Sequence, residues 1–368
     1  MKLNKTNLVF FLPNFSEGGA GRSITTICNN LDNKFFNLTV ISIGKCYYKK
    51  LFNKKTTFYE LDKKKTLFSF FQIRKILKKN YNKKNTIFIS NMNYANILSC
   101  LFIKLGMNFS LVLSERTPLK ELYIFYNFSD FFKKKIIYFL MKLIYRFADK
   151  VVVNSLFTKN EFDKKIKCNL ELIHSPSLGK IKIKKVKNIT GKLRILSIGR
   201  LSKEKRFDIL IDIIEQLKKH DVKAHIIGNG PLEFALKQKI KSKKLSRKII
   251  IKKYNKNYIH YFKKNNIYIN TSDFEGFPNT VVEAINNNLF VLSRDSGGGI
   301  HDMIINSSFG KIIDSNDPKI LANELLKIST KKINKKFHNK NNIITKKFNN
   351  FLSYNVSKKY EKIFKSLV

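Results

Sequence analysis

The chain has few acidic residues, and this shortage sets its charge. Against 72 Lys and Arg, the 368 residues include only 26 Asp and Glu, which gives a formal net charge of +46. Such a field attracts anionic lipid headgroups, nucleic acid or anionic glycans. A biased coding composition explains the evenly spread Lys residues more simply than a nucleic-acid patch, and no zinc-finger, recognition-helix or RNA-binding motif accompanies them. We therefore expect no nucleic-acid partner and a peripheral contact with an anionic membrane.

Cysteines are few and long apolar runs are missing. The spacing of Cys28, Cys46, Cys100 and Cys168 indicates neither a disulfide framework nor a metal site, and it fits a reduced, cytoplasmic setting. No run of about 18 uncharged apolar residues occurs, and Pro13 soon interrupts the apolar start of the chain. We expect neither a spanning helix nor a signal peptide, and a protein that works at the inner face of the cytoplasmic membrane.

The apolar residues that are present alternate between two kinds of pattern. A hydrophobic share of 43% over 368 residues is enough for two domains with sizeable cores. Runs at residues 8–12, 38–43 and 86–90 predict buried strands, and a helical pattern at 66–79 lies between the second and the third. Strands that alternate with helices predict an α/β fold with a parallel sheet, which is a nucleotide-binding type of domain.

The most informative stretch is SDFEGFPNTVVEA, residues 272–284. An apolar run at residues 267–270 predicts a buried strand before it, and the Gly-Phe-Pro within it predicts a tight loop. A helix follows, which Asn279 or Thr280 can cap. The N-terminus of this helix would present free backbone N–H groups and the positive end of its dipole to a phosphate.

Two carboxylates in this stretch can face one cleft. Glu275 lies on the predicted loop and Glu283 lies inside the predicted helix. Beside an anion site, carboxylates accept hydrogen bonds from hydroxyl groups such as those of a sugar or a ribose. The residues alone leave a second interpretation open, in which Glu275 is solvated and Glu283 lies on the helix surface.

Two other loops have the composition of phosphate sites. Gly18 and Gly19 lie between a strand and an apolar helix predicted at residues 23–31, a layout that can cradle a phosphate but that can also be only a tight turn. Arg200 and Lys205 follow a later strand, where Arg offers a bidentate fork and Lys a point charge to a diphosphate. In so basic a chain, these two can equally be surface charges.

Two features of the first half remain open. Glu115 and Arg116 follow a strand predicted at residues 111–113, at the edge where open α/β sheets bind ligands. They are candidates for an acceptor or donor-sugar contact or for a surface ion pair. Residues 130–146 predict a basic, aromatic amphipathic helix, which either lies in a bilayer interface or packs on the core with a solvated Lys face.

The stretch at 272–284 resembles the Glu-seven residues-Glu signature of the family 4 retaining glycosyltransferases, also called glycosyl transferases group 1. The matching residues are Ser272, Glu275, Gly276, Phe277, Pro278, Glu283 and Ala284. Gly-Arg-Leu at residues 199–201, followed by Lys205, resembles the second signature of this family. The resemblance implies the GT-B architecture, two Rossmann-like domains that face each other across a cleft.

The family pattern also implies domain boundaries. Residues 1–178 would form an acceptor-side Rossmann-like domain, residues 179–192 a linker, and residues 193–350 the nucleotide-sugar-binding domain. Residues 351–368 would form a closing helix that packs back toward the first domain.

The resemblance implies a role for each candidate residue. In the catalytic set, Glu275 would hold the donor sugar, while Arg200 and Lys205 would stabilise the departing diphosphate without a metal. Glu283 would bind the ribose hydroxyls of the donor. The other donor-binding candidates are Gly18, Gly19, Gly276, Phe277, Pro278, Asn279, Thr280 and Tyr254.

The implied reaction moves a hexose or N-acetylhexosamine from a nucleotide-diphosphate sugar, expected to be UDP-linked, with retention at the anomeric carbon. The acceptor would be a glycan or lipid-linked molecule in surface polysaccharide or lipopolysaccharide synthesis, and Glu115 and Arg116 would contact this acceptor or the donor sugar. The nucleotide-sugar is a substrate, and we expect no cofactor and no metal, since no Asp-x-Asp motif stands in a suitable context.

Two other classes of protein share this fold and remain open. One is a phosphorylase, which would need a pyridoxal-binding Lys that the sequence does not identify. The other is a noncatalytic carbohydrate-binding or membrane-recruited partner subunit, which would bind sugar without turnover.

Overall fold

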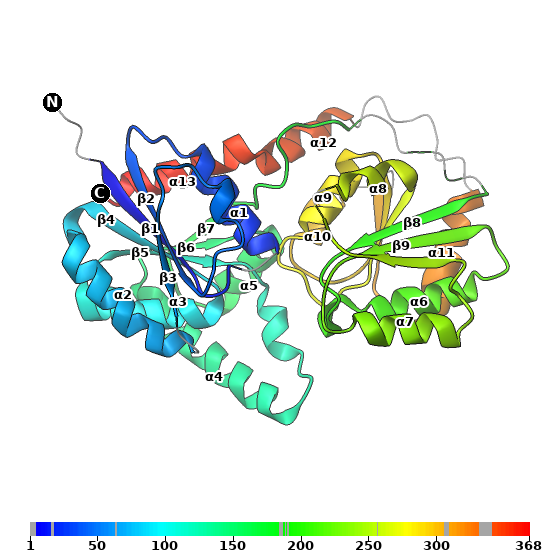
Figure 1. Ribbon diagram of the computed structural model, residues 1–368, viewed down its shortest axis with the longest axis horizontal. Helices are drawn as coiled ribbons and strands as arrows, with labels where there is room; N and C mark the ends of the chain where they lie inside the picture. Colours follow the sequence, from blue (N-terminus) through cyan, green and yellow to red (C-terminus); the bar gives the residue numbers. More distant parts are fainter. Residues whose placement is uncertain are drawn as a thin grey trace. The chain divides into compact units, whose positions relative to one another are not determined.

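The computed structural model describes residues 5–15, 18–62, 65–183, 187, 189, 191–255, 257–304, 309–330 and 341–368. The chain divides into two compact units, each with its own sheet (Figure 1). Unit 1 holds Met1–Gly179 and Asn350–Val368, and unit 2 holds Lys180–Asn349. Part of the predicted linker, at residues 184–186, 188 and 190, lies outside the described residues.

Within the described residues, unit 1 is built on a seven-stranded parallel sheet in the order β3-β2-β1-β4-β5-β6-β7. The strands are β1 (Thr6–Leu12), β2 (Phe36–Ile43), β3 (Thr57–Leu61), β4 (Thr86–Asn91), β5 (Ser110–Glu115), β6 (Lys150–Val153) and β7 (Leu170–Leu172). The strands predicted at 8–12, 38–43 and 86–90 are confirmed as parts of β1, β2 and β4. Their apolar residues fit a parallel sheet that helices cover on both faces.

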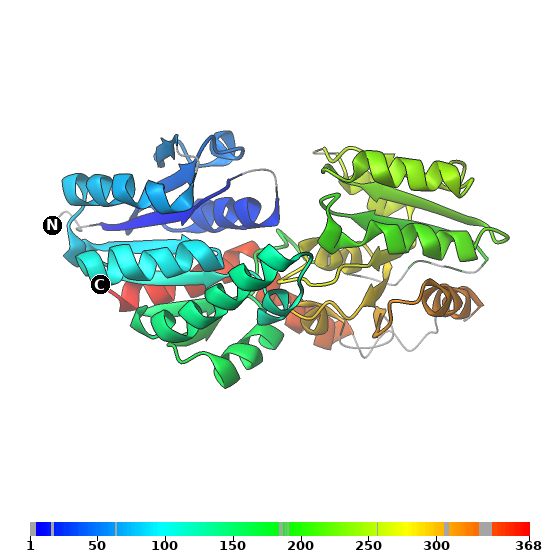
Figure 2. The same cartoon turned by 90° about the horizontal axis from the view of Figure 1, so that it is seen from below.

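Alternate residues of β1 belong to two cores, one on each face of the sheet. Leu8 and Phe10 pack with α1 (Gly19–Asn30) and α13 (Ser353–Ser366). Val9 and Phe11 pack with α2 (Thr66–Asn80), α3 (Asn93–Ser99), α4 (Phe128–Ile144) and α5 (Leu156–Lys165). Figures 1 and 2 show α2, α3 and α4 on the same side of this sheet. The short helical segments are η1 (Lys49–Leu51), η2 (Lys83–Asn85), the π-helix η3 (Cys100–Leu105), η4 (Leu119–Tyr123) and η5 (Tyr145–Phe147).

The last helix of the chain, α13, belongs to unit 1. The ring of Phe364 meets those of Phe10 and Phe36 edge-on, each at a centroid distance of 6.1 Å. A parallel bridge between Leu178 and Leu352 leads the chain into this helix. Residues from the two ends of the sequence therefore share one core.

Unit 2 is built on a second parallel sheet, with six strands in the order β10-β9-β8-β11-β12-β13 among its described residues. The strands are β8 (Leu193–Ile198), β9 (Val222–Ile227), β10 (Ile249–Lys252), β11 (Ile267–Asn270), β12 (Phe290–Arg294) and β13 (Gly310–Ile313). The helices are α6 (Phe207–Gln216), α7 (Glu233–Ser242), α8 (Ile259–Lys264), α9 (Asn279–Asn286), α10 (Ile300–Met303), α11 (Pro318–Thr330) and α12 (Asn341–Phe348), with the short segment η6 (Lys203–Lys205). The short segment η7 (Asn349–Phe351) begins at the last residue of unit 2 and continues into unit 1. The strand order changes direction between β8 and β11, which is the kind of switch point where open α/β sheets bind ligands.

The four cysteines all lie in unit 1 and carry free thiols. Burial raises the pKa of each thiol, to about 12 for Cys100 and Cys168. A thiol with so high a pKa is a poor nucleophile, which favours structural roles for these residues. In the part of the chain that the structure describes, no helix is both long enough and apolar enough to cross a bilayer.

Candidate functional site

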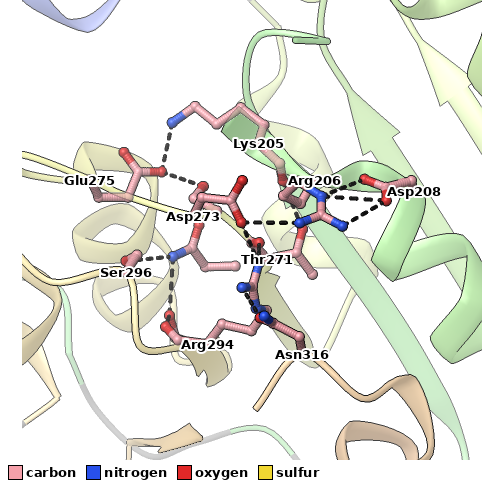
Figure 3. Close-up of polar contacts among 12 residues, drawn as sticks. Lys205, Arg206, Asp208, Thr271, Asp273, Glu275, Arg294, Ser296 and Asn316 are labelled. Carbon is pink, nitrogen blue, oxygen red and sulfur yellow. Dashed lines mark hydrogen bonds and ion pairs between the residues drawn. The ribbon is translucent and has the colours of Figure 1, made fainter. Parts of the chain in front are cut away.

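The switch point of unit 2 brings together two of the predicted catalytic residues. Lys205 follows β8 and Glu275 follows β11, and Lys205 Nζ lies 2.6 Å from Glu275 Oε1 (Figure 3). Ser272 Oγ lies 2.7 Å from the same carboxylate oxygen and 2.9 Å from Asn270 Oδ1. Asn270 Nδ2 in turn donates to Ser293 Oγ at 3.0 Å, so the end of β11 fixes the position of the Glu275 carboxylate.

A second polar cluster lies beside this ion pair. Asp273 Oδ1 accepts hydrogen bonds from Arg206 Nη1 at 3.2 Å and from Arg294 Nη1 at 3.1 Å (Figure 3). Arg294 is buried, and its Nη1 also donates to the carbonyl of Thr271 at 2.6 Å. Arg206 holds the left-handed conformation with φ of 48° and is further bound to Asp208. We call Arg206, Asp273 and Arg294 the clamp, because it ties the loop after β8 to the loop after β11.

Glu283 is buried and bound to an aromatic side chain that the sequence did not indicate. Tyr258 Oη lies 2.9 Å from each carboxylate oxygen of Glu283. The ring of Tyr258 lies 4.8 Å from that of Tyr254, a predicted donor-binding residue, and the two planes are tilted by 31°. The structure thus joins Glu283 and Tyr254 through Tyr258, and Glu283 does not lie on a solvated helix surface.

The predicted capping of α9 is wrong. The helix begins at Asn279 with Pro278 in the N-cap position, and no side chain of the described residues caps it. Asn279 and Thr280 already lie in the first turn, where a side chain cannot act as N-cap. The hydroxyl of Thr280 lies 2.7 Å from that of Tyr268 instead.

Close backbone packing shapes the loops around Glu275. At Gly298, which has φ of +60°, a Cβ atom would lie 1.8 Å from the carbonyl oxygen of Glu275. At Gly299 it would lie 2.5 Å from the ring of Phe277, which is buried. The amide of Gly299 donates to the carbonyl of Gly276 at 2.7 Å. Gly276 and Phe277 therefore hold the loop in place against the glycine cluster after β12.

Arg200 is exposed on the loop after β8, and among the described residues no hydrogen bond or ion pair joins its side chain to Lys205 or Glu275. The backbone of this loop packs tightly on the Gly-Asn-Gly turn after β9. A Cβ atom at Gly228 would lie 1.9 Å from the carbonyl oxygen of Gly199, and one at Gly230 would lie 2.4 Å from that of Leu201.

The glycine loop of unit 1 is shorter than predicted. The helix expected at residues 23–31 begins earlier, at Gly19, so only Gly18 precedes it. Gly18 N lies 3.0 Å from Tyr48 Oη. The chain needs glycine at position 21, because a Cβ atom there would lie 2.8 Å from the ring of Tyr48.

Glu115 and Arg116 do not pair with each other. Glu115 is only 2% exposed, and its Oε1 accepts hydrogen bonds from Asn96 Nδ2 at 2.6 Å and from the hydroxyl of Tyr145. Burial raises the pKa of Glu115 to about 7, against the opposing effect of these two hydrogen bonds. Enclosed in this way, the carboxylate holds α3 and η5 to the end of β5.

Arg116 differs from Glu115 in its exposure and in its partner. Its guanidinium donates from Nε at 3.3 Å and from Nη2 at 3.2 Å to Asn91 Oδ1, a neutral amide oxygen. Burial lowers the pKa of Arg116, and no carboxylate of the described residues forms an ion pair with it. The carboxyl edge of the sheet in unit 1 therefore carries a half-buried cation without a counter-charge.

The comparison with known families agrees with this geometry. Residues 179–346 match the family model described as Glycosyl transferases group 1, a span that includes Lys205, Glu275 and Glu283. Unit 2, which this span covers almost entirely, belongs to this family. The chain is a glycosyltransferase, and the recognition based on the stretch at 272–284 is confirmed.

Curated relatives and a solved structure extend the match over the rest of the chain. The chain is 28% identical over 261 residues to the N-acetylgalactosamine-N,N'-diacetylbacillosaminyl-diphospho-undecaprenol 4-alpha-N-acetylgalactosaminyltransferase of Campylobacter jejuni, covering 69% of each chain. It is 24% identical to the amylovoran biosynthesis glycosyltransferase AmsD of Erwinia amylovora, over 88% of this chain and 90% of that one. The structure of Anabaena Alr3699/HepE in complex with UDP-glucose has a TM-score of 0.74 at 14% identity, with 98% of this chain and 100% of that one covered. This likeness confirms the predicted GT-B fold.

In this glycosyltransferase, sequence reasoning missed four residues that position the predicted ones: Arg206, Tyr258, Asp273 and Arg294. Two of them carried a weak signal. Arg206 directly follows Lys205, and Asp273 lies inside the family signature. Tyr258 and Arg294 reach the site only through the packing of α8 and β12.

Proposed function

We propose that this glycosyltransferase moves a hexose or N-acetylhexosamine from a UDP-sugar to a glycan or lipid-linked acceptor in the synthesis of a surface polysaccharide or lipopolysaccharide. The ion pair of Lys205 with Glu275 carries the proposal, because a donor needs a cation for its diphosphate and a carboxylate for its sugar hydroxyls. The relatives add support: one is named as an N-acetylgalactosaminyltransferase, and one solved structure holds UDP-glucose.

Donor binding would exchange the partners within this ion pair. Nζ of Lys205 would move from Glu275 to the diphosphate, and Glu275 would then accept hydrogen bonds from the sugar hydroxyls. As the bond between sugar and diphosphate breaks, negative charge gathers on the phosphate oxygens. Lys205, Arg200 and the N–H groups in the first turn of α9 would stabilise this charge. The clamp would support this exchange by tying the loop that carries Lys205 to the loop that carries Glu275.

The nucleoside would bind beside the diphosphate. The carboxylate of Glu283 would accept hydrogen bonds from the ribose hydroxyls, and Tyr258 fixes its orientation through contacts of 2.9 Å to both oxygens. The ring of Tyr254, which lies against Tyr258, offers a flat apolar surface to the base.

On the acceptor side, we assign the charged contact to Arg116 and a supporting role to Glu115. A half-buried guanidinium whose side-chain partner is a neutral amide is suited to a phosphate. The Campylobacter jejuni relative is named for an acceptor that carries a diphosphate on undecaprenol. An acceptor of this class would place the reaction at the inner face of the cytoplasmic membrane.

A panel of UDP-, GDP- and ADP-sugars tests the proposal by nucleotide release from the purified full chain. We expect release with UDP-sugars and loss of at least about 99% of it in Glu275→Gln, since a charged hydrogen bond in a catalytic site is worth a few kcal/mol. The matched control is Glu215→Gln, which breaks another Lys–Glu ion pair, that of Glu215 near the end of α6 with Lys243 directly after α7. It should keep the parent rate.

Two outcomes would contradict this function. One is nucleotide release at the same rate from Glu275→Gln and Glu215→Gln, which would mean that the ion pair of Lys205 with Glu275 takes no part in the reaction. The other is donor binding by the parent chain without any turnover when an extract of cell membranes supplies acceptors, which would favour a noncatalytic sugar-binding subunit.

A further inference from the structure

Helix α4 of unit 1 has two apolar faces, of which one is buried. Ile137, Met141 and Ile144 lie in the core beneath the sheet. Five other large apolar residues of the same helix are between 44% and 78% exposed: Phe128, Phe132, Ile136, Phe139 and Leu143. We call these five the outer α4 stripe.

The outer α4 stripe is one continuous feature. Its members follow one another at intervals of three or four residues, which places them on a single side of a helix from its first turn to its last. The rings of Phe128 and Phe132 touch, with centroids 4.8 Å apart. Single exposed apolar residues are common on protein surfaces, but a contiguous patch indicates an interaction site. Neither expectation for residues 130–146 was complete, because the helix packs on the core and also exposes an apolar face.

Cations and aromatic rings border the stripe. Lys133, Lys135 and Lys142 are exposed on α4. Lys135 Nζ lies 5.6 Å from the ring centre of Phe131, and Lys142 Nζ lies 5.0 Å from that of Tyr138. Within α4 the one carboxylate, Asp130, is paired with Lys134 at 3.1 Å. An apolar face with a cationic, aromatic border is typical of surfaces that lie in a membrane interface.

A second helix on the same side of the sheet shows the same combination. Phe68 and Phe71 of α2 are 51% and 60% exposed, and Phe71 lines a hollow together with Arg74, Lys75 and Lys78. Figures 1 and 2 show α2 and α4 on either side of α3, below the sheet of unit 1. Apolar groups and cations thus recur across this layer of helices.

The charge of the surface selects its partner. A second copy of the chain that packed stripe against stripe would bring Lys135 and Lys142 toward their own counterparts, in a protein that already carries a net charge of +46. Anionic headgroups would neutralise these cations while the acyl region receives the aromatic rings. We infer that the outer α4 stripe docks on an anionic lipid surface, with α2 adding further cations. The inference rests on the proposed function, because a lipid-linked acceptor would lie in the membrane on which the outer α4 stripe docks.

Vesicle binding by the full chain tests the inference. The probes are vesicles of phosphatidylcholine alone and vesicles that also contain phosphatidylglycerol, separated from free protein by flotation. We expect the parent chain to float with the anionic vesicles, and the double substitution Phe132→Gln and Phe139→Gln to weaken that binding by at least about tenfold. The matched control is Tyr354→Gln, which removes an exposed aromatic ring from α13 on the opposite face of the sheet and should leave binding unchanged.

A charge variant separates the two contributions. Lys135→Gln with Lys142→Gln should weaken binding to anionic vesicles, by about 30-fold if each Lys contributes about 1 kcal/mol, and should make it less sensitive to salt. Circular dichroism and nucleotide release without vesicles verify that each variant is folded and that its donor site is intact. A variant that loses vesicle binding but releases nucleotide normally would show that its substitutions affect the stripe and not the donor site. A parent chain that binds vesicles but releases no nucleotide would contradict only the proposed function.

The inference is overturned if the parent chain ignores anionic vesicles, or if the Phe132 and Phe139 variant binds as tightly as the parent. It is also overturned if the parent is a dimer in solution that the same substitutions convert into a monomer, because the stripe would then cover a second copy.

Discussion

At the scale of single residues, burial distinguishes two glutamates that the sequence offered as candidates for sugar contacts. Glu275 is in contact with Lys205 at a switch point between strands, where open α/β sheets bind ligands. Glu115 is buried and bound to Asn96 and Tyr145, and burial raises its pKa against the effect of these two hydrogen bonds. A carboxylate in the first position can bind a substrate, and one in the second position holds the protein together.

The pKa of Glu115 predicts a pH-dependent stability. In the folded chain the carboxyl group binds its proton more tightly than in the unfolded chain, because the pKa rises from 4.5 to about 7. The free energy of unfolding should therefore fall as pH rises through this window and stay low above it. Relative to Glu115→Gln, which keeps an oxygen acceptor but does not titrate, the decrease should be on the order of 3 kcal/mol.

Urea unfolding of both chains at pH 5 and at pH 8 measures this difference. Glu215→Gln serves as the control, since its carboxylate is an ordinary partner of Lys243 at the surface. Parallel pH profiles for the parent and Glu115→Gln would show that the group ionises in the folded chain as it does in the unfolded chain.

At the scale of elements, the shape of the proposed donor site depends on how closely two loops approach each other. Gly298 and Gly44 both have positive φ, of +60° and +77°. A side chain at Gly44 would meet nothing within 4 Å, whereas one at Gly298 would run into the backbone of Glu275. Substitutions at these two glycines therefore separate the free-energy cost of the left-handed backbone conformation from the cost of the steric contact with Glu275.

Gly44→Ala should lower the free energy of unfolding by about 1 kcal/mol, the ordinary cost of a left-handed residue, and leave UDP binding unchanged. Gly298→Ala should cost at least about 2 kcal/mol more and weaken UDP binding, because the loop that carries Glu275 must move. Urea unfolding and calorimetric titration with UDP measure the two effects. Equal losses in the two variants would mean that the contact at Gly298 relaxes without moving the loop.

Sequence patterns predicted the elements better than the contacts between them. The strands β1, β2 and β4 and the helix α2 were predictable because apolar periodicity is a local property. The cap of α9 was not, because whether Asn279 lies before the helix or inside it depends on the turn at Pro278. The outer face of α4 was also hidden, since sequence alone cannot show which of two apolar sides meets the core.

At the scale of the whole molecule, the candidate contacts fall into separate units. Glu283 belongs to unit 2 with the proposed nucleoside site, and Arg116 belongs to unit 1 with the proposed acceptor site. The roles proposed for the units rest on the family signature, because both sheets arise from similar apolar runs and the runs do not distinguish them. The clamp and Tyr258 were not accessible, because their contacts join residues that lie far apart in the sequence.

This division predicts that substitutions in the two units affect different substrates. Glu283→Gln should raise KM for the UDP-sugar, and Arg116→Gln should raise KM for the acceptor, each by about tenfold or more for the loss of a charged hydrogen bond. Steady-state kinetics with a polyprenyl-diphosphate-linked sugar tests both, with the exposed Arg247→Gln as a control for the loss of one cation. When the acceptor is the same sugar on an alkyl chain without phosphate, Arg116→Gln and the parent should have the same KM for the acceptor. A donor effect of Arg116→Gln, or an acceptor effect of equal size without the phosphate, would contradict the assignment.

The position of α13 has a consequence for how the protein is made. Val356 and Phe364 fill the core of unit 1 against α1 and β1, yet all of unit 2 is translated between them and the rest of that core. The first unit therefore leaves the ribosome with part of this apolar face open until residues 353–366 have been translated. Termination before residue 353 would remove this helix and leave that part of the N-terminal sheet uncovered, however complete unit 2 already was.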